Sequence, residues 1–92
     1  MQTFKLVFSK EANRGIKEIE KSYPGSSKDR LKKILYILCT DPYARIYGWE
    51  TLKGVPDTYS FELNKKDRIV YQVDDERSVV TVLLVRGHYY DK

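Results

Sequence analysis

The sequence contains few residues that cross-link chains or bind metals: one cysteine and one histidine among 92 residues. The single cysteine, Cys39, excludes an internal disulfide and a cluster of thiolate metal ligands. Because Cys39 lies in an apolar stretch, we expect it to be a small buried hydrophobic residue rather than a nucleophile. The single histidine, His88, can donate or accept a proton near neutral pH, although a lone histidine is more often incidental than functional.

Long hydrophobic runs are also missing. No stretch approaches the roughly 18 apolar residues of a membrane-spanning helix, and the first residues lack the apolar core of a signal peptide. Internal repeats and low-complexity segments are absent as well. We therefore expect a cytoplasmic protein with no membrane contact. A single domain over residues 1–92 is near the lower size limit for a chain that folds alone.

Aromatic and charged residues are plentiful. Eight tyrosines, three phenylalanines and a hydrophobic content of 41% can supply one compact core. Lysine and arginine outnumber aspartate and glutamate by 17 to 13, which gives a formal net charge of +4. An excess of positive charge favours an anionic partner, because a lysine or arginine that meets a phosphate releases counterions. Many soluble domains are equally basic, so charge alone does not identify that partner.

Hydrophobic periodicity predicts one strand and two helices in the first part of the chain. Phe4, Leu6 and Phe8 alternate with Lys5 and Val7, which is typical of a strand. Ser9 can cap a first helix, which residues 24–27 (Pro-Gly-Ser-Ser) break. Either serine of this segment can cap a second helix, and Asp41 and Pro42 end that helix. The apolar faces comprise Ala12, Ile16, Ile19 and Tyr23 in the first helix and Leu31, Ile34, Leu35 and Leu38 in the second. We expect Lys28, Arg30, Lys32 and Lys33 to form an ordinary solvated face of the second helix.

The second part of the chain predicts a β-meander. Alternating residues indicate strands over residues 59–63 and 69–73, and the apolar run 79–85 indicates a central strand. Polar turns over residues 64–67 and 74–77 join them as antiparallel neighbours. The connection 43–56 resists assignment and can hold a short strand. The order β-α-α-β-β-β predicts an α+β fold, with a helical hairpin packed on one face of a mainly antiparallel, twisted sheet.

Three residue types in this pattern suit the cleavage of RNA without a metal. A base must take the proton of the 2′-hydroxyl, a cation must stabilise charge on the phosphoryl oxygens, and an acid must protonate the departing 5′-oxygen. Glu50, Arg68 and His88 can fill these roles in that order. Arg68 begins one predicted strand and His88 follows the next, so antiparallel pairing brings both to the same edge of the sheet. Glu50 lies in the irregular connection, so the sequence alone does not place it.

Strand parity adds detail to this hypothesis. Alternation puts Arg68, Val70 and Gln72 on one face of their strand and Ile69, Tyr71 and Val73 on the other. A regular pleat would put Arg86 and His88 on one face of the next strand, which Gly87 could disturb.

Three segments, Glu50–Lys53, Asp67–Tyr71 and Arg86–Tyr89, resemble in order and spacing the YoeB/Txe branch of the RelE/ParE toxin superfamily, whose members belong to type II toxin–antitoxin systems. The resemblance covers nearly the whole chain and implies a RelE/ParE-like fold. It also implies an mRNA interferase, an endoribonuclease that cleaves messenger RNA in the ribosomal A site and arrests translation. The implied partners are the ribosome, mRNA, a cognate antitoxin of the Phd/YefM kind and a second copy of the chain. No metal or other cofactor is implied.

The resemblance also implies a role for each site residue. Glu50 matches the general base, Arg68 the transition-state arginine, His88 the general acid and Tyr89 the residue that positions the substrate. Tyr89 would stack on an unpaired base, a contact worth roughly 1–3 kcal/mol. Lys53 matches a basic contact of the family. We further expect Lys65, Lys66 and Arg86 to bind RNA.

Departures from the family pattern leave two alternatives open. Phe61 and Glu62 stand where relatives often carry two adjacent arginines, Gly87 stands where an aromatic residue is common, and residues 90–92 extend beyond the usual end. The scaffold is also compatible with a non-enzymatic, ParE-like toxin that inhibits DNA gyrase. An inactive RNA-binding relative is the other alternative. A stoichiometric inhibitor, however, has no chemical need for a terminal histidine together with an upstream glutamate.

Overall fold

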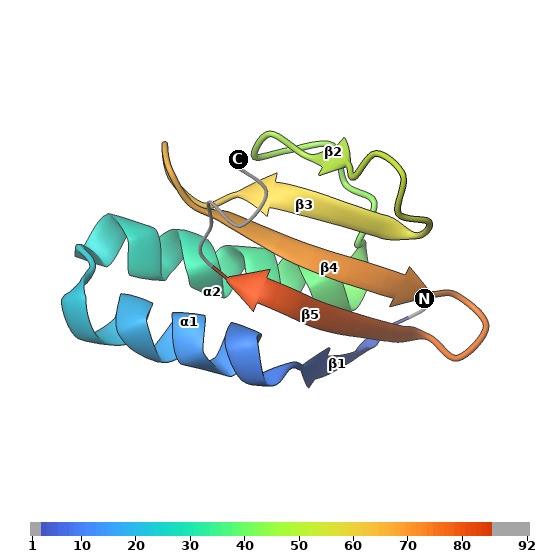
Figure 1. Ribbon diagram of the computed structural model, residues 1–92, viewed down its shortest axis with the longest axis horizontal. Coiled ribbons are helices and arrows are strands. Elements are labelled where there is room, and N and C mark those ends of the chain that lie inside the picture. The colour runs from blue at the N-terminus through green and yellow to red at the C-terminus, as the bar shows by residue number, and fades with distance from the viewer. Residues whose placement is uncertain (1–2, 86–92) are drawn as a thin grey trace.

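The computed structural model describes residues 3–85, in which two helices pack on one face of a five-stranded sheet (Figure 1). In chain order the elements are β1 (Lys5–Phe8), α1 (Lys10–Ser22), α2 (Gly25–Thr40), β2 (Glu50–Thr51), β3 (Thr58–Glu62), β4 (Arg68–Asp74) and β5 (Val79–Val85). The strand order across the sheet is β1-β5-β4-β3-β2, with β1 parallel to β5 and every other pair antiparallel. The predicted α+β class, helical hairpin and mainly antiparallel sheet are confirmed.

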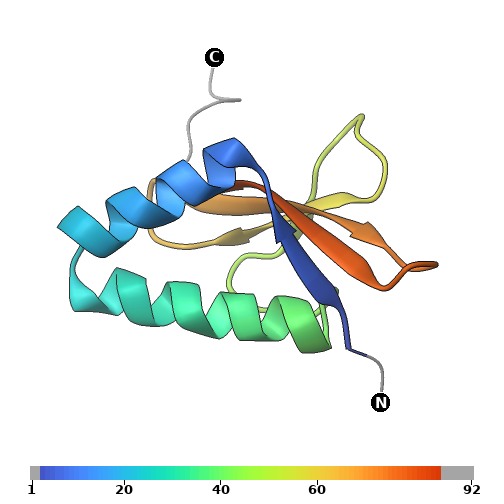
Figure 2. The same cartoon turned by 90° about the horizontal axis from the view of Figure 1, so that it is seen from below.

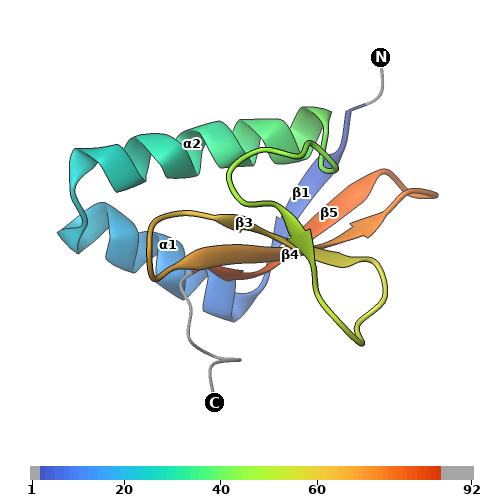
Figure 3. The same cartoon turned by 90° about the horizontal axis from the view of Figure 1, so that it is seen from above.

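Figures 2 and 3 show the two helices lying together on one side of the sheet, while the connection from α2 to β2 turns back from the end of α2 before it reaches β2. That connection, which resisted assignment from the sequence, contains the two-residue strand β2. Glu50 pairs with Ser60 of β3, and Thr51 pairs with Tyr59. Neither helix of residues 3–85 is long and apolar enough to cross a membrane.

The two helices begin differently. As predicted, Ser9 caps α1, since its hydroxyl oxygen accepts a hydrogen bond from the backbone N–H of Ala12 at 3.0 Å. The expectation that Ser26 or Ser27 caps α2 is wrong: the helix begins at Gly25, with Pro24 as the N-cap residue. The Pro24 carbonyl accepts the N–H of Ser27 at 3.1 Å, so backbone groups make the first contact of this helix. The Ser27 hydroxyl instead accepts a hydrogen bond from Asn64 at 3.4 Å.

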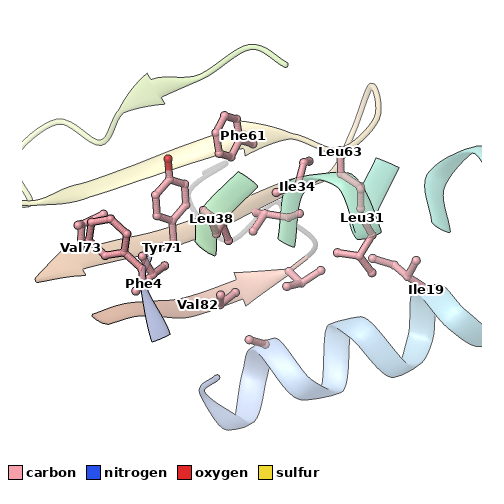
Figure 4. Close-up of a cluster of buried hydrophobic side chains, with 14 residues drawn as sticks. Phe4, Ile19, Leu31, Ile34, Leu38, Phe61, Leu63, Tyr71, Val73 and Val82 are labelled. Atoms are coloured by element: carbon pink, nitrogen blue, oxygen red, sulfur yellow. The ribbon is translucent and has the colours of Figure 1, made fainter. Parts of the chain in front are cut away.

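The core lies between the helices and the inner face of the sheet. As parity predicted, Ile69, Tyr71 and Val73 of β4 face the helices and are at most 5% exposed. Figure 4 shows side chains of both helices meeting those of β3, β4 and β5. The buried cluster comprises Phe4, Ala12, Ile19, Leu31, Ile34, Leu38, Phe61, Leu63, Ile69, Tyr71, Val73, Val80, Val82 and Val85. Arg68, Val70 and Gln72 lie on the opposite face of the sheet, which is called the open face below.

A β-bulge interrupts the pairing of β4 with β5. Val70 of β4 pairs with Leu84, whereas Tyr71, the next residue of β4, pairs with Val82. Leu83 is therefore an extra residue on β5, and the alternation of side chains shifts by one position after it. As a result Val85 faces the core and is only 1% exposed, while Leu84 lies on the open face opposite Val70.

Ser9 binds the backbone of β5 at this bulge. Its N–H donates to the carbonyl of Val82 at 3.0 Å, and its hydroxyl donates to the carbonyl of Leu83 at 2.7 Å. The same hydroxyl oxygen caps α1. One serine therefore fixes the start of a helix and the irregularity of a strand that lies 74 residues further along the chain.

Gly15 allows α1 to approach β5 more closely than any other residue could. A Cβ atom added at Gly15 would lie 1.9 Å from the carbonyl oxygen of Val85 and 3.1 Å from its Cβ. The obstacle is backbone in the middle of the contact between α1 and β5, so the strand or the helix must move. We expect Gly15→Ala to lower the free energy of unfolding by roughly 3 kcal/mol, at the upper end of overpacking effects.

A second glycine provides the control for this prediction. Gly25, at the start of α2, has nothing within 4 Å of an added Cβ. Gly25→Ala should therefore stabilise the protein by about 0.5 kcal/mol through the unfolded state. Urea unfolding of the two variants measures both effects, and equal stabilities would contradict the close contact of α1 with β5.

Candidate active site on the open face

Strand pairing aligns polar side chains on the open face. Because directly paired residues share a face, Glu50 of β2, Ser60 of β3 and Val70 of β4 form one row across the sheet. Arg68 lies two residues before Val70 on β4 and therefore on the same face, where it pairs with Glu62 of β3. The register thus places Arg68 diagonally across the sheet from Glu50, although the two residues are far apart in sequence.

The guanidinium of Arg68 is held by acceptors from three segments of the chain. Its Nη2 forms an ion pair with Oε2 of Glu50 at 3.3 Å and donates to the carbonyl of Gly48 at 2.5 Å. Its Nε donates to the hydroxyl oxygen of Ser60 at 2.9 Å. Among the described residues, Nη1 has no hydrogen-bond partner, so this edge of the guanidinium can receive an anion. The Arg68 side chain is 22% exposed and that of Glu50 is 59% exposed, so both can be reached from solvent.

A tight turn carries the Gly48 carbonyl to Arg68. Tyr47 and Gly48 both have left-handed backbone conformations, with φ of 51° and 64°. A Cβ at Gly48 would come within 3.0 Å of Oε1 of Glu62, so the turn needs glycine for both its conformation and its space. The carbonyl of Tyr47 accepts the N–H of Glu62 at 2.6 Å, which ties the turn to the end of β3.

Aromatic packing holds the rest of the connection between α2 and β2 in place. The indole of Trp49 stacks on Tyr59 with ring centroids 5.4 Å apart, and its Nε1 donates to the hydroxyl of Tyr71 at 2.8 Å. Tyr71 in turn donates to the carbonyl of Pro42. Tyr43 packs its edge against Tyr59. Trp49 therefore packs among aromatic residues of the sheet, which fixes the position just before Glu50.

The Tyr71 hydroxyl makes the free energy of unfolding depend on pH in the alkaline range. Burial raises the pKa of Tyr71 above its ordinary value of 10.0, although the hydrogen bond from Trp49 opposes the shift. Because the folded-state pKa is the higher one, the stabilisation is fully present below about pH 10 and is lost as the pH rises beyond it. We expect wild-type stability to fall above that pH by up to about 1.4 kcal/mol per pH unit from this group.

Tyr71→Phe isolates this contribution. At pH 8 the variant should be less stable by about 1–3 kcal/mol, since Trp49 Nε1 and the Pro42 carbonyl lose their partner. Between pH 10 and 11 it should lose less stability than the wild type. Urea titrations at these pH values test both statements, and equal alkaline losses would show that Tyr71 does not titrate with folding.

The predicted RNA-binding lysines do not form one patch. Lys53 is exposed on the loop that precedes β3, whereas Lys65 and Lys66 are exposed in the turn that follows it. The turn is rigid at its end, because the Asn64 side chain accepts the N–H groups of Lys66 and Asp67 at 3.0 Å each. Lys65 and Lys66 thus lie at the Arg68 end of the sheet, and Lys53 lies at the other end of β3.

Three predicted site residues, Arg86, His88 and Tyr89, lie outside the described residues. Sequence reasoning also missed two that are described, Ser60 and Gly48, which orient the guanidinium of Arg68. Strand parity could have placed Ser60 on the face of Arg68. Nothing in the sequence signals a carbonyl ligand at Gly48.

The opposite end of the open face is acidic. A hollow of about 730 Å³ lies between the loop before β3 and the turn that joins β4 to β5. Its lining includes the carboxylates of Asp57, Asp74, Asp75 and Glu76. Arg77 also lines the hollow, but its charge is outnumbered by the four carboxylates, so the lining is acidic overall. Within residues 3–85, no three histidine, cysteine, aspartate or glutamate side chains gather in a way that could hold a metal ion.

No family model and no curated protein sequence matches the chain. Solved structures do match it over nearly its whole length. A YoeB/ParE toxin from Agrobacterium tumefaciens aligns with a TM-score of 0.82 at 21% identity, covering 94% of this chain and 100% of the other. The chain has the fold of the YoeB toxins.

Two further structures with the YoeB fold agree. The YoeB dimer from Staphylococcus aureus has a TM-score of 0.77 at 23% identity and covers 95% of this chain and 99% of its own. A heterotetrameric YoeB–YefM toxin–antitoxin complex from the same organism has a TM-score of 0.75 at 24% identity, covering 94% of this chain and 98% of that one. The fold implied by the sequence resemblance is therefore confirmed.

Proposed function

We propose that the protein is the toxin of a toxin–antitoxin pair and acts as a ribosome-dependent mRNA endoribonuclease. The observation that carries the proposal is the ion pair of Glu50 with Arg68 on the open face of a YoeB fold. A carboxylate and a guanidinium at 3.3 Å supply a proton acceptor and a cation within reach of one phosphodiester. An unreactive scaffold would not require this pair at a partly exposed position.

The proposed reaction is a transesterification within RNA. Glu50 takes the proton of the 2′-hydroxyl, and the 2′-oxygen attacks the adjacent phosphorus. Arg68 stabilises the charge that develops on the phosphoryl oxygens. The bond from phosphorus to the 5′-oxygen breaks, and His88 donates its proton to that oxygen. The products are a 2′,3′-cyclic phosphate and a 5′-hydroxyl, with no water or metal consumed in the step.

The other proposed contacts are assigned by position and charge. Lys65 and Lys66 lie at the Arg68 end of β3 and can meet the RNA backbone there, and Lys53 can meet it further along. Arg86 adds positive charge, and Tyr89 stacks on a base. The proposed partners are the ribosome with its mRNA, and an antitoxin of the Phd/YefM kind, as in the YoeB–YefM complex. A homodimer is proposed by analogy with the YoeB dimer.

Cleavage assays with programmed ribosomes test the proposal. Purified protein should cut mRNA within the A-site codon, and primer extension should map a single new end there. The downstream fragment should accept phosphate from a polynucleotide kinase without prior phosphatase treatment, because its 5′ end is a hydroxyl. A DNA gyrase supercoiling assay runs in parallel. Inhibition of gyrase without mRNA cleavage would replace the proposal with the ParE-like alternative, and neither activity would indicate an inactive relative.

A further inference from the structure

Arg30 does not belong to the solvated face predicted for the second helix. Its guanidinium carbon lies 4.2 Å from the ring centroid of Tyr47, and its Nη1 donates to the carbonyl of Glu62 at 3.1 Å. The residue is partly buried, unlike Lys32 and Lys33 of the same helix, which are exposed. Arg30 therefore joins α2 to two segments that lie next to the candidate active site.

These two segments are also joined to each other. The carbonyl of Tyr47 accepts the N–H of Glu62 at 2.6 Å, so Arg30 contacts both residues of one backbone hydrogen bond. The residue after Tyr47 is Gly48, whose carbonyl accepts Nη2 of Arg68. Only a short path of contacts separates the guanidinium of Arg30 from that of Arg68.

The turn needs an external contact to stay in place. Tyr47 has a left-handed backbone conformation with φ of 51°, which is unfavourable for a residue with a large side chain. Such conformations persist only where the surrounding structure determines them. A planar guanidinium can stack on the Tyr47 ring and donate to the Glu62 carbonyl at the same time. A lysine ammonium cannot reproduce both contacts.

We propose that Arg30 is a positioning residue for the Glu50–Arg68 pair. It holds the turn at Tyr47 and Gly48, so that the Gly48 carbonyl and the Glu50 carboxylate both meet the Arg68 guanidinium. The inference rests on the proposed function, because the pair is positioned for RNA cleavage. Arg30 itself touches neither residue of the pair and takes no part in proton transfer.

Three variants test the proposal by steady-state kinetics with programmed ribosomes. Arg30→Met should lower kcat by about 10- to 100-fold with KM changed less than twofold, since a small misplacement of a catalytic group costs this much. Arg30→Lys should be similarly impaired, because it keeps the charge but loses the stacking. Lys32→Met, which removes one exposed charge from the same helix, should leave kcat unchanged. Thermal midpoints set an assay temperature at which every variant is folded.

The opposite kinetic pattern would overturn the inference. If Arg30→Met raises KM and leaves kcat intact, and Arg30→Lys restores KM, then Arg30 acts as a charge for the RNA. If both variants match the wild type, Arg30 positions nothing. If the wild type cleaves no RNA but Arg30→Met makes Trp49 more accessible to acrylamide quenching, the proposed function is rejected and the role of Arg30 in holding the turn is retained.

Trp49 supplies a readout that does not need activity. It is the only tryptophan in the chain and follows Gly48 directly. Arg30→Met should make Trp49 more accessible to acrylamide quenching, whereas Lys32→Met should not. Identical quenching in all variants would show that the turn stays in place without Arg30.

Discussion

Arg68→Gln is expected to lower the rate of mRNA cleavage by about 10²- to 10³-fold, the usual loss when a donor that stabilises developing negative charge is removed. The side chain is held by Ser60, Gly48 and Glu50, and within residues 3–85 its Nη1 has no hydrogen-bond partner. Glutamine retains a polar group at the site but carries no positive charge. The loss should appear in kcat, because the charge on the oxygens is greatest in the transition state.

Arg68→Lys separates charge from geometry. Lysine keeps the positive charge but cannot replace the Nε bond to Ser60, whose side chain is fully buried. We expect activity between those of the wild type and Arg68→Gln. Arg68→Gln also loses the ion pair with a largely exposed Glu50, which contributes little to stability. In both variants the buried Ser60 hydroxyl loses its donor, so we expect the thermal midpoints to fall. Wild-type cleavage by Arg68→Gln would remove this residue from the mechanism.

His88→Gln is expected to lower the rate of mRNA cleavage by about 10²- to 10⁴-fold, because glutamine cannot protonate the departing 5′-oxygen. The wild type should show a bell-shaped dependence of rate on pH where chemistry limits turnover. The variant should lose the alkaline fall, which reflects deprotonation of the acid. Measuring rates from pH 5 to 9 with ribosomes of constant composition provides the comparison.

Antitoxin binding is the control for His88→Gln. The variant should keep the fold and bind the antitoxin as the wild type does, which shows that only the chemistry is lost. Because His88 is the only histidine, its imidazole resonances are unambiguous and can be titrated directly. Near-wild-type cleavage by the variant would assign the acid to another group.

The fold could be predicted from the sequence because its signals are local. Period-2 and helical patterns, the Ser9 cap and the turn residues all lie within a few positions of the structures they specify. The predicted serine cap of α2 was wrong because the backbone carbonyl of Pro24 takes the place of a side-chain cap. The shift of side chains after Leu83 could not be predicted, because a bulge depends on the partner strand and on Ser9 from a distant segment.

The candidate site was only partly predictable for a related reason. The resemblance to the YoeB/Txe branch singles out Glu50 and Arg68, whose residue types suit acid–base and electrostatic roles. Their contact depends on β2, a strand of two residues whose pairing with Ser60 no periodicity reveals. Arg30 and Gly48 act through a stacked ring and a backbone carbonyl. Such contacts become visible only once the chain is folded.

The pairing of β1 with β5 has a consequence for synthesis of the protein. β1 is made before the other described strands, yet its partner in the sheet is the last of them, with Lys5 opposite Val79. Nascent chains that end before β5 can form the two helices but leave β1 without a neighbour and α1 without its packing surface. Such non-local pairing slows folding. The protein would thus acquire its native sheet only after β5 has been translated.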